Sequence, residues 1–265
     1  MFRLSEVPSH GAGVGCYNNK NMKAGKRMSG KTYLWIEDRI GKASYKFWTT
    51  FMHEICPEII VESKMSNREL VKAVRGLTDK ENRYIVALDN SFDNVQVCIE
   101  KKKLKEAVQN MDNVFLLELI CFEYTLLEFD KLIDWIYASE DEFREKRAGA
   151  IAARKKLVQI INSGEMNYKE MQEIMDYDSK LDNYNVEQLS AKLLFTLTRN
   201  TGFEVSKGNL GECWRQNCCE WADKQEDDIC GLNQNRLTLS DKMKSVYLGT
   251  SICREFRNIG LEVHL

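Results

Sequence analysis

YLWIED, at residues 33–38, sets four largely apolar side chains in a row and then stops at two acids. The pattern recurs twice: residues 84–89 are YIVALD, with Asp93 close behind, and residues 114–118 are VFLLE. Short, uninterrupted apolar runs of this kind are typical of strands buried on both faces, as in the parallel sheets of α/β proteins. The three runs therefore predict a parallel sheet in which each strand is followed by a carboxylate.

Segments with helical spacing separate these runs. Large apolar residues recur at that spacing in residues 45–55, which end before Pro57, and Ser66 with Glu69 three residues later forms a capping box for a second helix. Between the two helices, residues 59–61 (IIV) form another short apolar run. Strand and helix thus alternate four times in roughly a hundred residues, which predicts an α/β, doubly wound parallel sheet with right-handed crossovers.

The strand pattern fades beyond Ser139, where helical patterns take over. We therefore expect three parts: a loop-rich N-terminal arm (residues 1–30), an α/β domain (31–138) and a helical C-terminal domain (139–265). Residues 119–137 are expected to form one long helix.

Composition narrows the functional classes. The formal net charge is -2, so binding to nucleic acid would require a local basic patch. No apolar stretch is long enough to cross a membrane, and the N-terminus lacks the apolar core of a signal peptide. Nine cysteines, an odd number, then favour reduced thiols and a cytoplasmic protein. Only three histidines occur, and none is near another candidate group, which argues against histidine-based catalysis.

The acids at the strand ends are the candidate functional site. Because the carboxyl ends of parallel strands meet at one edge of a sheet, Glu37, Asp89 and Asp93 should converge there. Glu118, after the third run, or Glu123, a few residues later, would complete the group; the sequence leaves this choice open. Clustered carboxylates suit Mg²⁺, with Mn²⁺ as the alternative, and such ions stabilise the oxygens of a phosphoryl group under attack.

The same residues resemble the Toprim domain of topoisomerases, primases and nucleases. Over roughly residues 31–137, the stretches LWIED (34–38) and IVALDNSFD (85–93) look most like the Toprim domains of bacterial antiphage effectors, which resemble the nuclease part of overcoming-lysogenisation-defect proteins. The resemblance implies that Glu37 is the catalytic glutamate and that Asp89 is the first acid of the Asp-x-Asp pair. It also implies that Asp93 is an extra acid that some of these effectors carry.

Two departures from the family pattern bear on activity. Asp38 follows the glutamate where glycine is usual, and Ser91 stands at the second aspartate of the pair. The resemblance implies a metal-dependent nuclease cutting RNA, such as tRNA, or DNA as a toxic defence effector, restrained or activated by a protein partner. The alternative is a Toprim-fold binding or regulatory subunit with a weakened site, which Ser91 favours. A homodimer is left open.

Basic residues offer candidate contacts with nucleic acid. We single out Lys31 before the first strand, and Arg147, Arg154 and Lys155 in a basic run that a helix should carry. Lys31 also closes a phosphate-loop pattern at residues 25–32 (GKRMSGKT), but a phosphate loop opens a helix, whereas this stretch leads into a strand. A nucleotide-hydrolysing protein is therefore disfavoured.

Four cysteines near the C-terminus form a second cluster. Cys213, Cys218, Cys219 and Cys230 could hold a structural zinc ion, but their spacing departs from the two-to-four-residue separation that closed zinc sites favour. The favoured interpretation is a buried core of reduced thiols.

Overall fold

The computed structural model of the protein describes residues 30–137, 141–164, 169, 185–220, 230–232 and 236–265. The predicted N-terminal arm lies outside the described residues, except for Gly30. Among the residues that are described, no helix is both long and apolar enough to cross a membrane.

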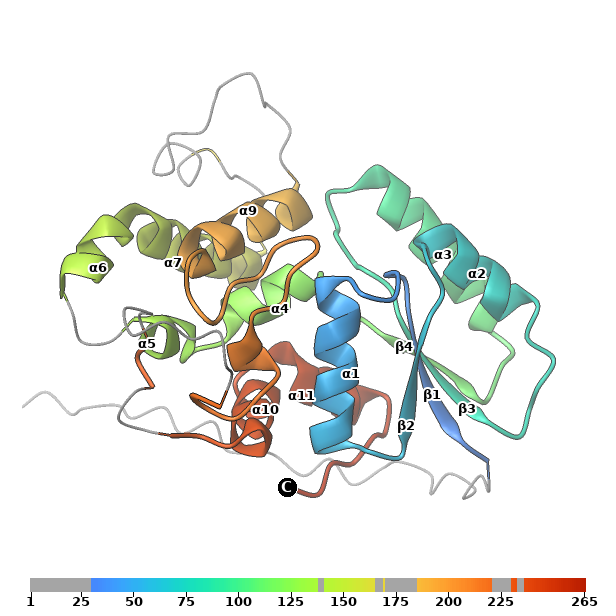
Figure 1. The fold of residues 1–265 in the computed structure, drawn as a ribbon. Coiled ribbons are helices and arrows are strands. Elements are labelled where there is room, and N and C mark those ends of the chain that lie inside the picture. Colours follow the sequence, from blue (N-terminus) through green and yellow to red (C-terminus); the bar gives the residue numbers. More distant parts are fainter. Residues whose placement is uncertain (1–29, 138–140, 165–168, 170–184, 221–229, 233–235) are drawn as a thin grey trace, which may run out of the picture.

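A four-stranded, all-parallel sheet confirms the predicted α/β class (Figure 1). Its strands are β1 (Thr32–Ile36), β2 (Ile59–Ser63), β3 (Arg83–Ala87) and β4 (Val114–Leu117), in the order β2-β1-β3-β4. β1 and β3 lie side by side in the middle, and the last residues of these two strands, Ile36 and Ala87, are register partners. The residues that follow these strands therefore leave the sheet next to each other.

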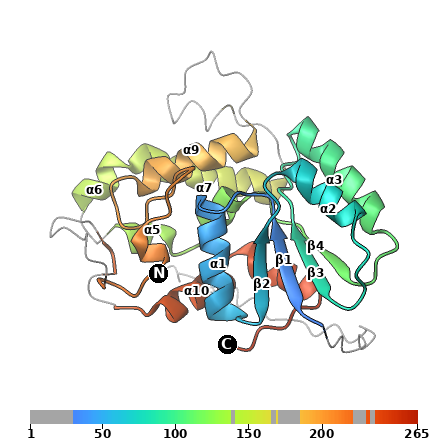
Figure 2. The ribbon, with the colours of Figure 1, turned by 45° about the vertical axis from the view of Figure 1, so that its right-hand side comes forward.

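Helices cover both faces of the sheet because successive side chains in each strand point to opposite sides. Leu34 and Ile36 pack towards α1 (Ala43–Ile55), whereas Trp35 packs towards α2 (Asn67–Arg75) and α3 (Val95–Val108). Figures 1 and 2 show α1 on one side of the sheet and α2 with α3 on the other. The serine half of the predicted capping box of α2 is present, since the Ser66 side chain accepts a hydrogen bond from the backbone N–H of Glu69, but the Glu69 carboxylate pairs with Lys72 (2.6 Å).

The helical part shares its core with the sheet. It comprises α4 (Phe122–Glu128), α5 (Leu132–Ile136), α6 (Asp141–Lys146), α7 (Ala148–Ser163), α9 (Val186–Thr198), the 3-10 turn η1 (Glu212–Trp214), α10 (Leu239–Leu248) and α11 (Ser251–Asn258). α9 packs on α4, and α10 packs on α1. One apolar cluster runs from Leu34 in β1 to Leu261, so the two parts are joined by a common core.

The single helix predicted over residues 119–137 is wrong: two short helices, α4 and α5, stand in its place. The chain leaves helical geometry at Phe129 (φ -52°, ψ 116°), whose side chain is fully buried. Arg154 of α7 supplies the donors that the broken helix lacks, because its Nε and Nη2 atoms donate to the carbonyls of Leu127 (2.6 Å) and Phe129 (2.7 Å). A distant guanidinium therefore satisfies the break, and no local sequence pattern reveals it.

Candidate functional site

Glu37 and Asp89 meet at the carboxyl edge of the sheet. Glu37 directly follows β1 and Asp89 comes two residues after β3, and their side chains are hydrogen-bonded to each other. Both line a pocket whose lining also includes apolar side chains such as Trp48 of α1 and Phe122 of α4. The pairing follows from the parallel register of β1 and β3, which brings the two strand ends together.

Burial governs the protonation of this pair. Desolvation raises the pKa of Glu37 to about 7, although its hydrogen bond with Asp89 acts to lower it. Burial and the neighbouring negative charge of Glu37 raise the pKa of Asp89 well above its ordinary value. The same hydrogen bond raises the pKa of Asp89, so the two carboxyl groups share a proton and titrate as a pair.

Asp38 also lines the pocket and is held in place from two sides. Its carboxylate accepts a hydrogen bond from the hydroxyl of Ser44, in the first turn of α1, and its backbone carbonyl accepts one from Ser63 at the end of β2 (2.5 Å). Asp38 raises the pKa of Glu37 by like-charge repulsion. The acid that stands where the Toprim pattern has glycine therefore adds negative charge to the site.

Glu123, in the first turn of α4, is the third acid that the structure brings to the pair. Burial raises its pKa to about 7, and the charges of Asp38 and Glu187 act in the same direction. The charge of Glu123 in turn raises the pKa of Asp89. Of the two acids that the sequence left open, the geometry brings Glu123 to Glu37 and Asp89.

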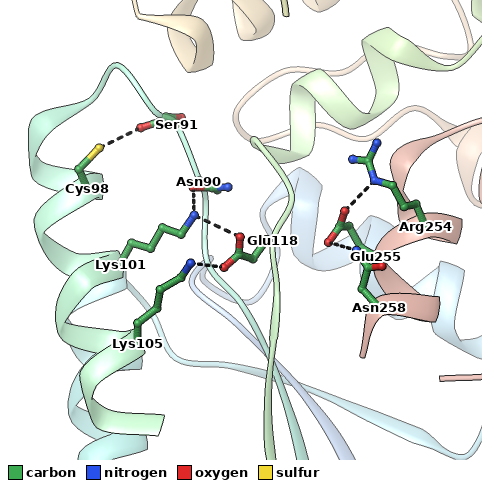
Figure 3. A network of polar contacts seen from close by, with 9 residues as sticks. All are labelled: Asn90, Ser91, Cys98, Lys101, Lys105, Glu118, Arg254, Glu255 and Asn258. Atoms are coloured by element: carbon green, nitrogen blue, oxygen red, sulfur yellow. Dashed lines mark hydrogen bonds and ion pairs between the residues drawn. The ribbon is translucent and has the colours of Figure 1, made fainter. Parts of the chain in front are cut away.

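Glu118 takes part in a different group. Its carboxylate lies 3.3 Å from Nζ of Lys101 and 2.7 Å from Nζ of Lys105, both on α3 (Figure 3). The two ammonium groups lower the pKa of Glu118, although partial burial acts against them. Its charge is therefore compensated by lysines, whereas among the described residues the charges that act on Glu37 are those of other acids.

A further acid, Glu187, comes from the helical part and was missed in the sequence. It lies in the first turn of α9, and burial raises its pKa, while a hydrogen bond from the side chain of Asn94 lowers it. Its charge raises the pKa values of Glu37, Asp89 and Glu123. The only local signal was the capping box at Asn185, which marks a helix start but says nothing about what lies beside it.

Asp93 holds this helix in position. Its Oδ2 atom accepts a hydrogen bond from the backbone N–H of Val186, the first residue of α9 (2.9 Å). The loop after β3 thus binds the start of α9 through Asp93 and Asn94, and this brings Glu187 to the acid cluster. A direct role for Asp93 in metal binding stays a prediction.

Ser91, at the second position of the Asp-x-Asp pattern, is fully buried. Its carbonyl accepts hydrogen bonds from the N–H of Asn94 (3.2 Å) and from the thiol of Cys98. Within the described part of the chain, its hydroxyl has no hydrogen-bond partner. The position is therefore polar but uncharged.

The four basic residues predicted to contact nucleic acid do not gather at this edge. Lys31 precedes β1 while Glu37 follows it, so about 3.3 Å per residue places them roughly 20 Å apart. Arg154 is engaged with carbonyls at the end of α4, and Arg147 is half-buried and hydrogen-bonded to Tyr137. Lys155 is exposed on α7.

The cysteine cluster surrounds a buried lysine. Cys213, Cys218 and Cys230 are buried and Cys219 is exposed, and all four lie within electrostatic reach of Lys242. The fully buried Lys242 donates from Nζ to the carbonyls of Cys213 (2.6 Å) and Gln216. In the part of the chain that the structure describes, no three His, Cys, Asp or Glu side chains form a ready set of metal ligands, either here or at the acid cluster.

No protein-family model, curated protein or solved structure matches the chain.

Proposed function

We propose that this protein is a metal-dependent phosphodiesterase of Toprim type that cuts RNA or DNA. The observation that supports it most is the direct contact of Glu37 with Asp89 at the carboxyl edge of a parallel sheet, with Glu123 and Glu187 close by. Four half-buried acids with raised pKa values are costly to a fold, because each must be ionised against its neighbours or kept protonated. Such a group is retained most readily when it has a chemical task.

The donor set suits Mg²⁺ or Mn²⁺. Glu37, Asp89 and Glu123 offer carboxylate oxygens, which these hard cations prefer, and burial and other acids account for their raised pKa values. The proton shared by Glu37 and Asp89 neutralises part of the negative charge that a cation would otherwise neutralise. Its loss would leave both carboxylates free to bind the cation. Bound there, the metal would polarise a phosphoryl oxygen and stabilise the charge that develops during cleavage.

The chain's own acids would manage protons. A carboxyl group with a pKa near 7 is partly protonated at neutral pH, which suits it to accept a proton from an attacking water or to donate one to a leaving oxygen. Glu37 and Glu123 both meet this condition. Apolar side chains in the pocket lining, such as Trp48 and Phe122, lower the local dielectric constant and so strengthen the electrostatic interactions beside them.

The biological setting rests on the resemblance to antiphage Toprim effectors. We propose a cytoplasmic toxic effector whose activity a protein partner restrains or triggers. The alternative is a Toprim-fold subunit that binds or regulates without chemistry, and one observation favours it: the buried, uncharged Ser91 replaces an acid of the Asp-x-Asp pair. Glu123 and Glu187 supply the negative charge that Ser91 lacks, which favours the active enzyme.

Cleavage by the purified protein tests the proposal. Labelled tRNA and plasmid DNA would be incubated with Mg²⁺, Mn²⁺ or excess chelator, using wild type, Glu37→Gln and Asp89→Asn. We expect metal-dependent cleavage in wild type and a loss of at least about a hundredfold in both variants, because each removes a charged ligand and a proton-transfer group.

Glu81→Gln is the matched control, since Glu81 is an exposed acid that lies before β3, at the opposite edge of the sheet. This control should cleave like wild type. Cleavage that survives in Glu37→Gln and Asp89→Asn would refute the proposed site, and binding without cleavage would favour the regulatory subunit.

A further inference from the structure

Two lysines of α3 reach the same edge of the sheet as the acids. Lys101 Nζ donates to Oδ1 of Asn90 and pairs with Glu118, and Lys105 pairs with the other oxygen of the same carboxylate (Figure 3). Asn90 is the residue after Asp89, and Glu118 directly follows β4. The lysines therefore lie beside the acid cluster, at the ends of β3 and β4.

The charge of this group is unbalanced. Two ammonium groups share one carboxylate, which leaves an excess of one positive charge. The Lys105 side chain is 51% exposed, so its ammonium faces solvent while it contacts Glu118. A phosphodiester carries one negative charge, and an ammonium group can donate three hydrogen bonds, so a backbone phosphate would complete the group.

A nucleic acid also needs positive charge here. The acids around Glu37 repel a polyanion, Lys31 lies at the opposite edge of the sheet, and Arg147 and Arg154 are engaged elsewhere. Just before α3, which carries the two lysines, Phe92 (38% exposed) presents an aromatic ring to solvent. Unpaired bases stack on surfaces of this kind, whereas paired bases are hidden inside a duplex.

We infer that Lys101 and Lys105 form a binding subsite for a backbone phosphate of a single-stranded nucleic acid, next to the phosphate that is cleaved. Glu118 holds the two lysines in position between turnovers. The inference rests on the proposed function, because it takes the acid cluster as the place of cleavage. RNA and DNA share the recognised phosphodiester, so both are compared in the test.

Binding measured without cleavage separates this subsite from the catalytic proposal. Fluorescein-labelled single-stranded RNA and DNA oligonucleotides would be titrated with Glu37→Gln protein in chelator, over a series of salt concentrations, with anisotropy as the readout. Adding Lys101→Gln and Lys105→Gln should weaken binding about tenfold at 0.1 M salt. The plot of log affinity against log salt should also become shallower by about 1.4, or about 0.7 per lost contact. Glutamine has a helix propensity close to that of lysine, so α3 should persist.

Two further variants make the outcome decisive. Lys80→Gln with Lys103→Gln removes the same charge from exposed positions, before β3 and on α3, and should change binding less than twofold. Glu118→Gln removes the carboxylate that competes for the lysines, so it should strengthen binding. A purely structural ion pair would give the opposite sign.

Each remaining result counts for or against the subsite. Failure of the Glu37→Gln protein to bind either oligonucleotide would overturn it, as would equal binding by the two double-lysine variants or weaker binding by Glu118→Gln. If the binding pattern holds but wild type cleaves nothing, the subsite stands and the nuclease proposal falls. If wild type cleaves and the Lys101 and Lys105 variants bind and cleave normally, the subsite alone is rejected.

Discussion

Glu123→Gln should stabilise the protein at high pH and leave it nearly unchanged at low pH. Burial raises the pKa of Glu123 to about 7 from an ordinary value of 4.5. At about 1.4 kcal/mol per pKa unit, ionising this group in the folded protein costs about 3.5 kcal/mol. Glutamine is not ionised, so the variant avoids this cost, less up to about 1 kcal/mol for the lost attraction between a carboxylate and the helix N-terminus.

The pH dependence follows from the direction of the shift. A raised pKa means that the folded protein binds more protons than the unfolded chain between about pH 4.5 and pH 7. Wild type therefore loses stability as pH rises through this window, and the cost is absent below it. We expect the variant to exceed wild type by about 2 kcal/mol at pH 8 and by less than about 1 kcal/mol at pH 5.

Urea unfolding followed by circular dichroism at pH 5 and pH 8, in chelator, measures this difference. A gain of about 2 kcal/mol should also raise Tm by about 4–8 °C. Glu81→Gln serves as the control and should change neither value by more than about 0.5 kcal/mol, since surface substitutions rarely do. An equal effect at both pH values, or a less stable variant at pH 8, would show that Glu123 is not a buried, destabilised acid.

Two other consequences can be measured on the same proteins. Mg²⁺ at 10 mM should stabilise wild type at pH 8 by about 1.4 kcal/mol if its Kd is about 1 mM, and by less at pH 5, where the carboxyl groups hold protons. Asp89→Asn should show little of this gain. An equal gain in both proteins would place the ion elsewhere. Arg154→Met should lower the free energy of unfolding by about 2–4 kcal/mol, because the carbonyls of Leu127 and Phe129 lose a charged donor in a buried place. Lys155→Met, on the same helix but exposed, should lower it by less than about 0.5 kcal/mol. Equal losses in the two variants would contradict the role of Arg154 at the end of α4.

The amino-acid sequence alone determined the sheet and the first two acids of the site. Apolar runs that end in acids are local patterns, and parallel pairing sends every strand's carboxyl end to one edge, so Glu37 and Asp89 could be expected to meet. The sequence could not choose between Glu118 and Glu123. That choice depends on the direction in which each side chain points after β4. Glu118 points to α3, where Lys101 and Lys105 pair with it, and Glu123 does not.

Only the tertiary structure decided which distant residues complete the site. Glu187 reaches the acids because Asp93 and Asn94 bind the start of α9, and Arg154 is withdrawn from solvent because α4 ends where its guanidinium can reach the carbonyls. Neither fact has a local signature, since a capped helix and a basic run look the same whether they face water or a neighbouring element. Charge and helical period are properties of the chain, but the partner of each charge is set by packing between segments far apart in sequence.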